Sequence, residues 1–141
     1  GRCAAFYTFV GEPIRALETL DRAEELDPFL PVWVIEERVA ALYILERYAD
    51  MIAAARRLPH QTRRTRLYQA AVMVKQGDMP AAQNLVREAL ADDPALSCEY
   101  VRSQELYQDD AVLKELTDLM TEAGLPDQPV EMPVRAVAAA T

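Results

Sequence analysis

Hydrophobic residues recur along this chain at helical spacing, and the pattern predicts a protein built from helices. Apolar side chains three or four positions apart form stripes near both ends of the chain, and this spacing places them on one face of an α-helix. The stripes comprise Ile14, Leu17, Leu20 and Leu26, then Leu85, Val86 and Leu90, then Val112, Leu113, Leu116, Leu119 and Met120. The same spacing along the whole chain predicts helices over 2–10, 12–26, 31–45, 47–58, 63–76, 79–91, 97–107 and 110–123.

The chain also repeats itself at a fixed offset of 66 residues. Leu20 and Val86 obey this offset, as do Gly11, Ala16, Ala23, Asp27 and Pro28, paired with Gly77, Ala82, Ala89, Asp93 and Pro94. A degenerate copy lies between them, with Arg47 and Tyr48 at the start of its second helix. Two units of 33 residues fit a repeated helical hairpin.

The residue types at the repeated positions have physical roles in such a hairpin. Gly11 and Gly77 suit the turn between two antiparallel helices, where a positive φ is readily adopted only by glycine. Alanines seven positions apart, such as Ala16 and Ala23, fall on one stripe and let helices approach closely. Pro28 and Pro94 end the second helix of each unit.

The C-terminal part of the sequence predicts a boundary. Gly124 is a stop signal for the last helix and Pro126 follows it,. From Pro126 to Thr141 the chain contains three prolines and no amphipathic period. We therefore expect one helical domain over 1–125 and a disordered tail over 126–141.

The repeat resembles the tetratricopeptide repeat (TPR). The first unit carries Ala4, Tyr7, Gly11, Ala16, Ala23 and Pro28, and the third carries Ala70, Gly77, Ala82, Ala89 and Pro94. The middle unit departs, because Glu46 replaces the turn glycine, Met51 replaces the packing alanine, and its second helix ends early at Pro59. The resemblance implies an all-α, right-handed TPR-like superhelix of about four helical hairpins, the first of them truncated.

A narrower resemblance concerns the last part of the chain. The stretches ALADDPALS and ELYQDDAVLKELTDLMTEAGLP, and above all EAGLP at 122–126, are similar to the C-terminal repeat arrays of bacterial proteins headed by a class III adenylate/guanylate cyclase domain. This resemblance implies a regulatory part of a longer cytoplasmic signalling protein. It transfers no catalytic residue to this sequence.

Composition narrows the function classes further. The chain has 15 basic and 23 acidic side chains and a net charge of −8, which disfavours nucleic acid and anionic membranes as partners. One histidine and two cysteines, Cys3 and Cys98, are too few for a typical His/Cys metal site,. We expect no cofactor, no metal and no catalytic site in this sequence.

TPR geometry implies which side chains face the concave groove formed by the first helices of the hairpins. These are Thr8, Trp33, Glu36, Tyr43, Arg64, Leu67, Lys75 and Val101. Trp33 and Tyr43 are candidates to grip a peptide, because aromatic residues dominate binding hot spots. The alternative, which we favour for each of them, is that they pack between repeats.

One basic segment stands out in this acidic chain. RRLPHQTRRTR at 56–66 holds five arginines and no acid. It is either a clamp for an anion or a set of arginines that offset a helix dipole and pair with acids of neighbouring helices, and the second interpretation is favoured. His60 is expected to be a solvated loop residue and Cys98 a small buried side chain.

Together these observations predict a non-catalytic module for protein–protein interaction. The expected partner is a protein or peptide bound in the groove, and self-association through apolar surface near Phe6 and Phe9 is an open alternative. The rival hypothesis is a sensor that encloses an anionic metabolite with the arginines of the irregular middle repeat.

Overall fold

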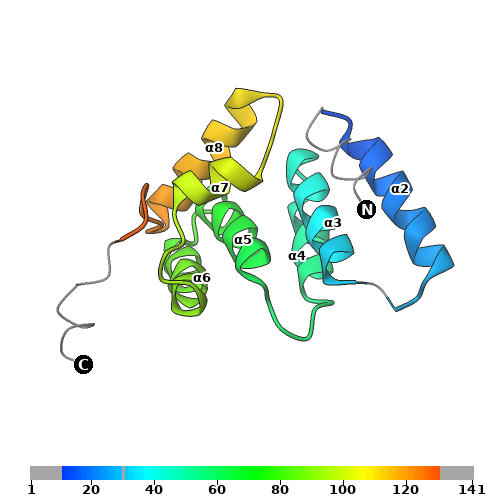
Figure 1. The fold of residues 1–141 in the computed structure, drawn as a ribbon, viewed down its shortest axis with the longest axis horizontal. Helices are drawn as coiled ribbons and strands as arrows, with labels where there is room; N and C mark the ends of the chain where they lie inside the picture. The colour runs from blue at the N-terminus through cyan, green and yellow to red at the C-terminus, as the bar shows by residue number, and fades with distance from the viewer. Residues whose placement is uncertain (1–10, 30, 131–141) are drawn as a thin grey trace, which may run out of the picture.

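A computed structural model describes residues 11–29 and 31–130 of the chain. Within these ranges the protein is entirely helical (Figure 1), as predicted. The described helices are α2 (Pro13–Leu26), α3 (Val32–Ile44), α4 (Tyr48–Ala55), α5 (Arg63–Lys75), α6 (Met79–Asp92), α7 (Cys98–Gln104) and α8 (Asp110–Glu122). The helix predicted over 2–10, the groove residue Thr8 and residues 131–141 of the predicted tail lie outside the described residues.

The helices follow one another as hairpins. α3 packs against α4, α5 against α6, and α7 against α8, while α2 packs against α3. Figure 1 shows α2 at one end, α3 and α4 beside it, and the last four helices on the other side. None of the described helices has the length and apolarity needed to cross a bilayer.

The turns inside the hairpins have the left-handed backbone that the repeat predicts. φ is +83° at Gly11 and +79° at Gly77, and Glu46 adopts +58° at the corresponding place in the middle unit. The N–H groups of Glu46 and Arg47 donate to the carbonyls of Tyr43 and Leu42, and those of Gly77 and Asp78 donate to Val74 and Met73 in the same arrangement. The middle repeat therefore makes the same turn without the glycine.

This strained glutamate gives a prediction about stability. A non-glycine residue in the left-handed region costs about 1–2 kcal/mol, while a glycine also adds freedom to the unfolded chain, worth roughly 0.4–1 kcal/mol. Glu46→Gly should therefore raise the free energy of unfolding by about 0.5–1 kcal/mol. Gly77→Ala is the matched reverse change, since a Cβ there meets no atom within 4 Å, and it should lower stability by a similar amount. Urea denaturation of both variants checks this; equal midpoints in all three proteins would contradict it.

Small side chains occupy the predicted buried positions of the second helices. Ala16, Ala82 and Ala89 are fully buried, and so is Met51 in the middle unit. Ala23 is half-buried. In the middle unit α4 already ends at Ala55, and Leu58 is buried in the turn that follows.

Asp-Pro ends the second helix in the same way in the first and third units. Asp27 and Asp93 are the C-terminal caps of α2 and α6, and both have extended backbone. The side chain of Asp27 accepts a hydrogen bond from the N–H of Phe29, and that of Asp93 accepts one from Ala95. The prolines between them, Pro28 and Pro94, are exposed and cannot continue a helix.

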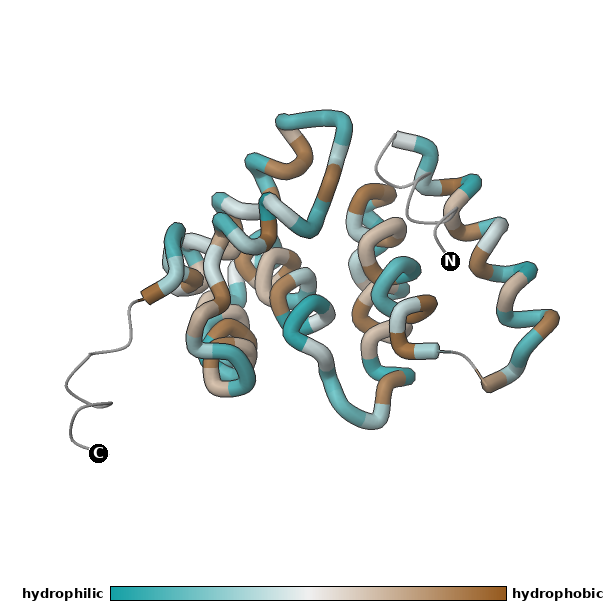
Figure 2. The backbone as a smooth tube through the Cα atoms, in the orientation of Figure 1, coloured by the Kyte–Doolittle hydropathy of each residue, from teal (hydrophilic) through white to brown (hydrophobic). Residues whose placement is uncertain are grey.

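The hydrophobic core lies in two unequal parts. A large cluster runs through α3 to α8, and its largest side chains include Met51, Tyr68 and Leu116. A separate pair, Leu20 and Val34, joins α2 to α3. Figure 2 shows hydrophobic positions recurring along each helix between hydrophilic ones, as expected for helices with one buried face,.

The last hairpin docks differently from the others. In the earlier units the second helix of one hairpin packs against the first helix of the next, as α2 does with α3 and α4 with α5. The main contact of the last hairpin is instead between α8 and α5. Leu116 and Met120 on α8 are buried there, and Asp109 caps the helix by accepting from the N–H of Ala111.

The start of the segment after α8 is hydrogen-bonded to the N-terminal end of α7. The carbonyls of Pro126 and Asp127 accept hydrogen bonds of 2.9 Å from the N–H groups of Cys98 and Glu99, and Asp127 also pairs with Arg102 at 2.8 Å. These bonds satisfy N–H groups at the start of α7 that have no partner within the helix. Packing thus continues two residues beyond the predicted boundary at 125.

Candidate functional site

A groove of about 680 Å³ lies between α3, α5 and α7. α3 contributes one wall, the N-terminal half of α5 the floor, and α7 with the segment before it the other wall. The residues that line it are Glu36, Glu37, Thr62, Arg63, Arg64, Leu67, Tyr68, Asp92, Leu96, Tyr100, Val101, Gln104, Glu105 and Met120. The first helices of three successive hairpins therefore meet at one hollow.

Arg64 is the centre of the groove's polar side chains. Its Nε and Nη2 donate to the two carboxylate oxygens of Glu105 at 2.5 and 2.8 Å. Its Nη1 donates to Oε1 of Glu37 at 2.6 Å, and the guanidinium lies 5.8 Å from the centre of the Tyr68 ring. One cation thus links α5 to α3 and to the end of α7.

The pairing keeps Arg64 charged despite its burial. Burial by itself lowers the pKa of the guanidinium, but neighbouring Tyr68 and the Glu105 and Glu37 carboxylates outweigh this and raise the pKa above its usual value. For Glu37 the balance is reversed: burial raises the pKa of the carboxyl above its usual 4.5, and Arg64 lowers it only in part. Glu37 is 9% exposed, and its Oε2 has no hydrogen-bond partner among residues 11–29 and 31–130.

The raised pKa of Glu37 predicts that the stability of the protein depends on pH. Because its pKa is raised in the folded protein, the folded state binds this proton more tightly than the unfolded state, and the carboxyl favours folding most when it is protonated. Its contribution to the free energy of unfolding is complete below about pH 4.5, the usual pKa of the carboxyl. The contribution is lost as the pH rises through the pKa that Glu37 has in the folded protein,. The stability of Glu37→Gln relative to the natural protein should therefore rise between acidic and neutral pH. Urea denaturation of both across this range checks it; a constant difference would contradict it.

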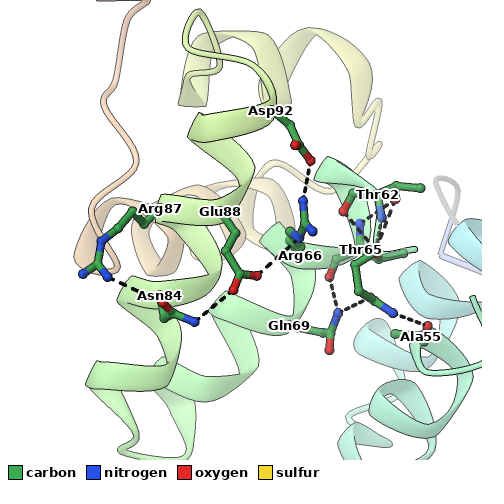
Figure 3. A network of polar contacts seen from close by, with 10 residues as sticks. Ala55, Thr62, Thr65, Arg66, Gln69, Asn84, Arg87, Glu88 and Asp92 are labelled. Atoms are coloured by element: carbon green, nitrogen blue, oxygen red, sulfur yellow. Dashed lines mark hydrogen bonds and ion pairs between the residues drawn. The ribbon is translucent and has the colours of Figure 1, made fainter. Parts of the chain in front are cut away.

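A polar network that includes the groove residues Thr62 and Asp92 holds α5 in position (Figure 3). Thr62 caps α5 by accepting from the N–H of Thr65, and the Thr65 hydroxyl accepts in turn from the N–H of Thr62. Further along the helix Arg66 pairs with Asp92 and Glu88 of α6. Thr62 also donates to Oε2 of Glu36 at 2.8 Å, so the cap of α5 holds a groove carboxylate of α3.

Arg63, Arg64 and Arg66 are paired with acids, as the favoured interpretation predicts. The helix-dipole role expected of Arg56 and Arg57 is wrong, because α4 ends at Ala55 and its last turn contains neither of them. Arg57 pairs with Glu24 of α2 at 2.9 Å and Arg63 with Asp93 at the end of α6 at 2.5 Å. Arg64 and Arg66 have the partners given above. Arg56 and His60 are exposed. An anion bound by Arg57, Arg63, Arg64 or Arg66 would therefore compete with a carboxylate already in place.

The structure brings together four of the side chains expected in the groove. Glu36, Arg64, Leu67 and Val101 line it. Trp33 does not line this groove and is 40% exposed, so neither the groove position nor the packing between repeats favoured for it is confirmed.

Tyr43 and Lys75 lie elsewhere, in a separate pocket of about 170 Å³ near the C-terminal ends of α3 and α5. Lys75 donates to Glu115 at 2.5 Å and to the Tyr48 hydroxyl at 2.9 Å, and its ammonium lies 5.9 Å and 5.4 Å from the Tyr43 and Tyr48 ring centres. Tyr43 is buried and meets the Tyr68 ring edge-on at 5.5 Å. The packing role favoured for Tyr43 is therefore confirmed.

Sequence reasoning missed the two carboxylates that hold Arg64. For Glu37 a signal existed, because apolar positions three or four residues away on the same face of α3 are buried, namely Val34, Ala40 and Ala41,. A charged residue on such a stripe needs a buried partner. Glu105 follows the end of α7, and no local pattern marks it.

Among the described residues, no group of three or more His, Cys, Asp and Glu side chains is arranged to hold a metal ion. Cys98 is fully buried, as predicted, and burial raises the pKa of its thiol, which makes it a poor nucleophile.

Comparisons of the chain with protein-family models, curated proteins and solved structures found no match. The case for a function therefore rests on the geometry and charge of the groove.

Proposed function

We propose that this protein is a non-catalytic interaction module whose groove between α3, α5 and α7 binds a segment of a partner protein. The observation that supports this most is the groove itself, formed where three successive hairpins meet. We further propose, from the sequence resemblances, that the hairpins form a TPR-like right-handed superhelix and belong to a longer bacterial cyclase-like signalling protein in the cytoplasm.

The lining suits a peptide. Apolar side chains such as Leu67 and Val101 lie beside carboxylates and guanidinium groups, and Tyr100 is 42% exposed at its edge. Aromatic residues at the edge of a pocket offer large contact areas at low entropic cost. The Arg64 pairs fix the walls relative to one another before binding, which reduces the ordering cost of association.

The test is selection of binders from a random peptide library displayed on phage, with the whole chain as bait. Enriched peptides should bind the natural protein and lose affinity roughly tenfold or more for Tyr100→Ala, as expected for an aromatic hot spot. Gln83→Ala is the control, since Gln83 is exposed on α6 and is not among the groove residues. No enrichment, or peptides equally sensitive to both changes, would contradict the proposal.

The rival hypothesis of a metabolite sensor gains less support from these contacts. Arg63 and Arg64 line the groove, but each already has a carboxylate partner. Thermal melts with phosphate and citrate test this alternative, and a large rise of the melting temperature would favour it over peptide binding.

A further inference from the structure

The groove carries more acid than base. Its lining includes the carboxylates of Glu36, Glu37, Asp92 and Glu105 and the guanidinium groups of Arg63 and Arg64. Arg63 is engaged by Asp93, which is not among the lining residues. Arg64 is shared between two of the lining carboxylates. Asp92 is likewise paired with Arg66, outside the lining. The three glutamates of the lining then face Arg64 as the remaining lining arginine, so the lining has negative charge that its own arginines do not balance.

The excess of negative charge is concentrated on the α3 wall of the groove. Glu36 accepts a hydrogen bond from the neutral Thr62 hydroxyl. Glu37 beside it is nine-tenths buried, and one of its two oxygens accepts from no donor that the structure describes. A buried carboxylate oxygen without a donor is costly, and a cationic N–H group from a ligand would relieve that cost with a strong, charge-assisted hydrogen bond.

We propose that the partner segment is basic, and that it places a lysine or arginine side chain against Glu36 and Glu37 while neighbouring apolar residues pack on Leu67, Val101 and Tyr100. This inference rests on the proposed function and names the chemistry of its partner. The net charge of −8 over the whole chain draws a basic partner toward the protein and increases its association rate.

An acidic segment fits the groove less well. It would face the unbalanced carboxylates, and it could reach Arg64 only by displacing Glu105 or Glu37. Removing either carboxylate from Arg64 leaves a buried charge without its partner, which is strongly unfavourable. A neutral apolar segment would offer no hydrogen-bond donor to the Oε2 atom of Glu37.

The experiment uses the enriched peptides of the phage selection as probes. They should contain lysine or arginine next to apolar residues. Replacing that basic residue with glutamine should weaken binding to the whole chain by roughly tenfold, measured by fluorescence polarisation, and replacing it with glutamate by more. Binding should also weaken as salt is raised.

A matched pair of protein variants locates the contact. Glu36→Gln keeps an acceptor for Thr62 and should lower affinity for the basic peptide roughly fivefold to tenfold, whereas Glu122→Gln, an exposed change on α8, should leave it unchanged. If the selected peptides are acidic or neutral, or ignore Glu36→Gln while still losing affinity for Tyr100→Ala, the inference is wrong and the proposed function stands. If no peptide is enriched, both are wrong.

Discussion

Replacing Arg64 with methionine should destabilise the protein by about 3–5 kcal/mol, which is typical for removal of one partner from a buried ion pair. The change leaves Glu37 and Glu105 buried without their cation, and Glu105 is only 4% exposed. A domain of this size has about 5–15 kcal/mol of stability in total. The melting temperature should therefore fall by more than about 10 °C, as measured by circular dichroism.

Two further variants separate the lost ion pair from a general effect of losing an arginine. Arg63→Met removes an arginine that is about half exposed and that, within the described part of the chain, pairs only with Asp93, and should cost less than about 1 kcal/mol. Adding Glu37→Gln and Glu105→Gln to Arg64→Met should recover part of the loss, because the stranded charges are then gone. Equal stability of Arg64→Met and Arg63→Met would show that the cluster contributes no more than a surface pair.

Replacing Ala82 with arginine is the second change with a large expected effect. Ala82 is fully buried within the main core cluster, on the face of α6 that packs against α5. A long side chain there overpacks the interface and brings a charge into it, and both effects cost several kcal/mol. The control is Gln83→Arg, because the next residue of the same helix is exposed. Similar melting temperatures of the two variants would contradict a role for Ala82 between helices.

Ala16→Arg makes the same change at the equivalent position of the first unit and should act more locally. Ala16 is also fully buried, but among the described residues the buried Leu20 of α2 pairs with Val34 of α3 apart from the main cluster, and only the partly buried Leu17 of α2 packs against that cluster. Hydrogen exchange should therefore show lost protection in α2 while α5 and α6 stay protected. Uniform loss of protection across all helices would show that α2 is part of the same cooperative unit.

The middle repeat differs from the other two units more in sequence than in structure. Glu46 and Met51 depart from the residues of the other two units, yet the turn and the buried position are retained. The backbone accepts a glutamate in the left-handed region, and a methionine adapts to irregular space in a core. The early end of α4 was also predicted, from Pro59, and the helix stops four residues before it.

The groove was predicted only in part. Glu36, Arg64, Leu67 and Val101 were expected there, and the structure places them there. Tyr43 and Lys75 lie on the same helices, but farther along them, and line the smaller pocket instead. A position on a helix predicts which face a side chain occupies, whereas how far the groove extends along that face depends on how neighbouring hairpins are placed.

The sequence by itself determined the helices, their turns and the small buried side chains that repeat from unit to unit. These features depend on residues close together in the chain: apolar spacing, a left-handed turn and Asp-Pro at a helix end. Only the tertiary structure decided that Arg64 lies between Glu37 and Glu105, which are 27 and 41 residues away, and that α8 docks on α5. Such contacts depend on the stacking of separate hairpins, and no short-range pattern encodes which distant carboxylate a buried cation will meet.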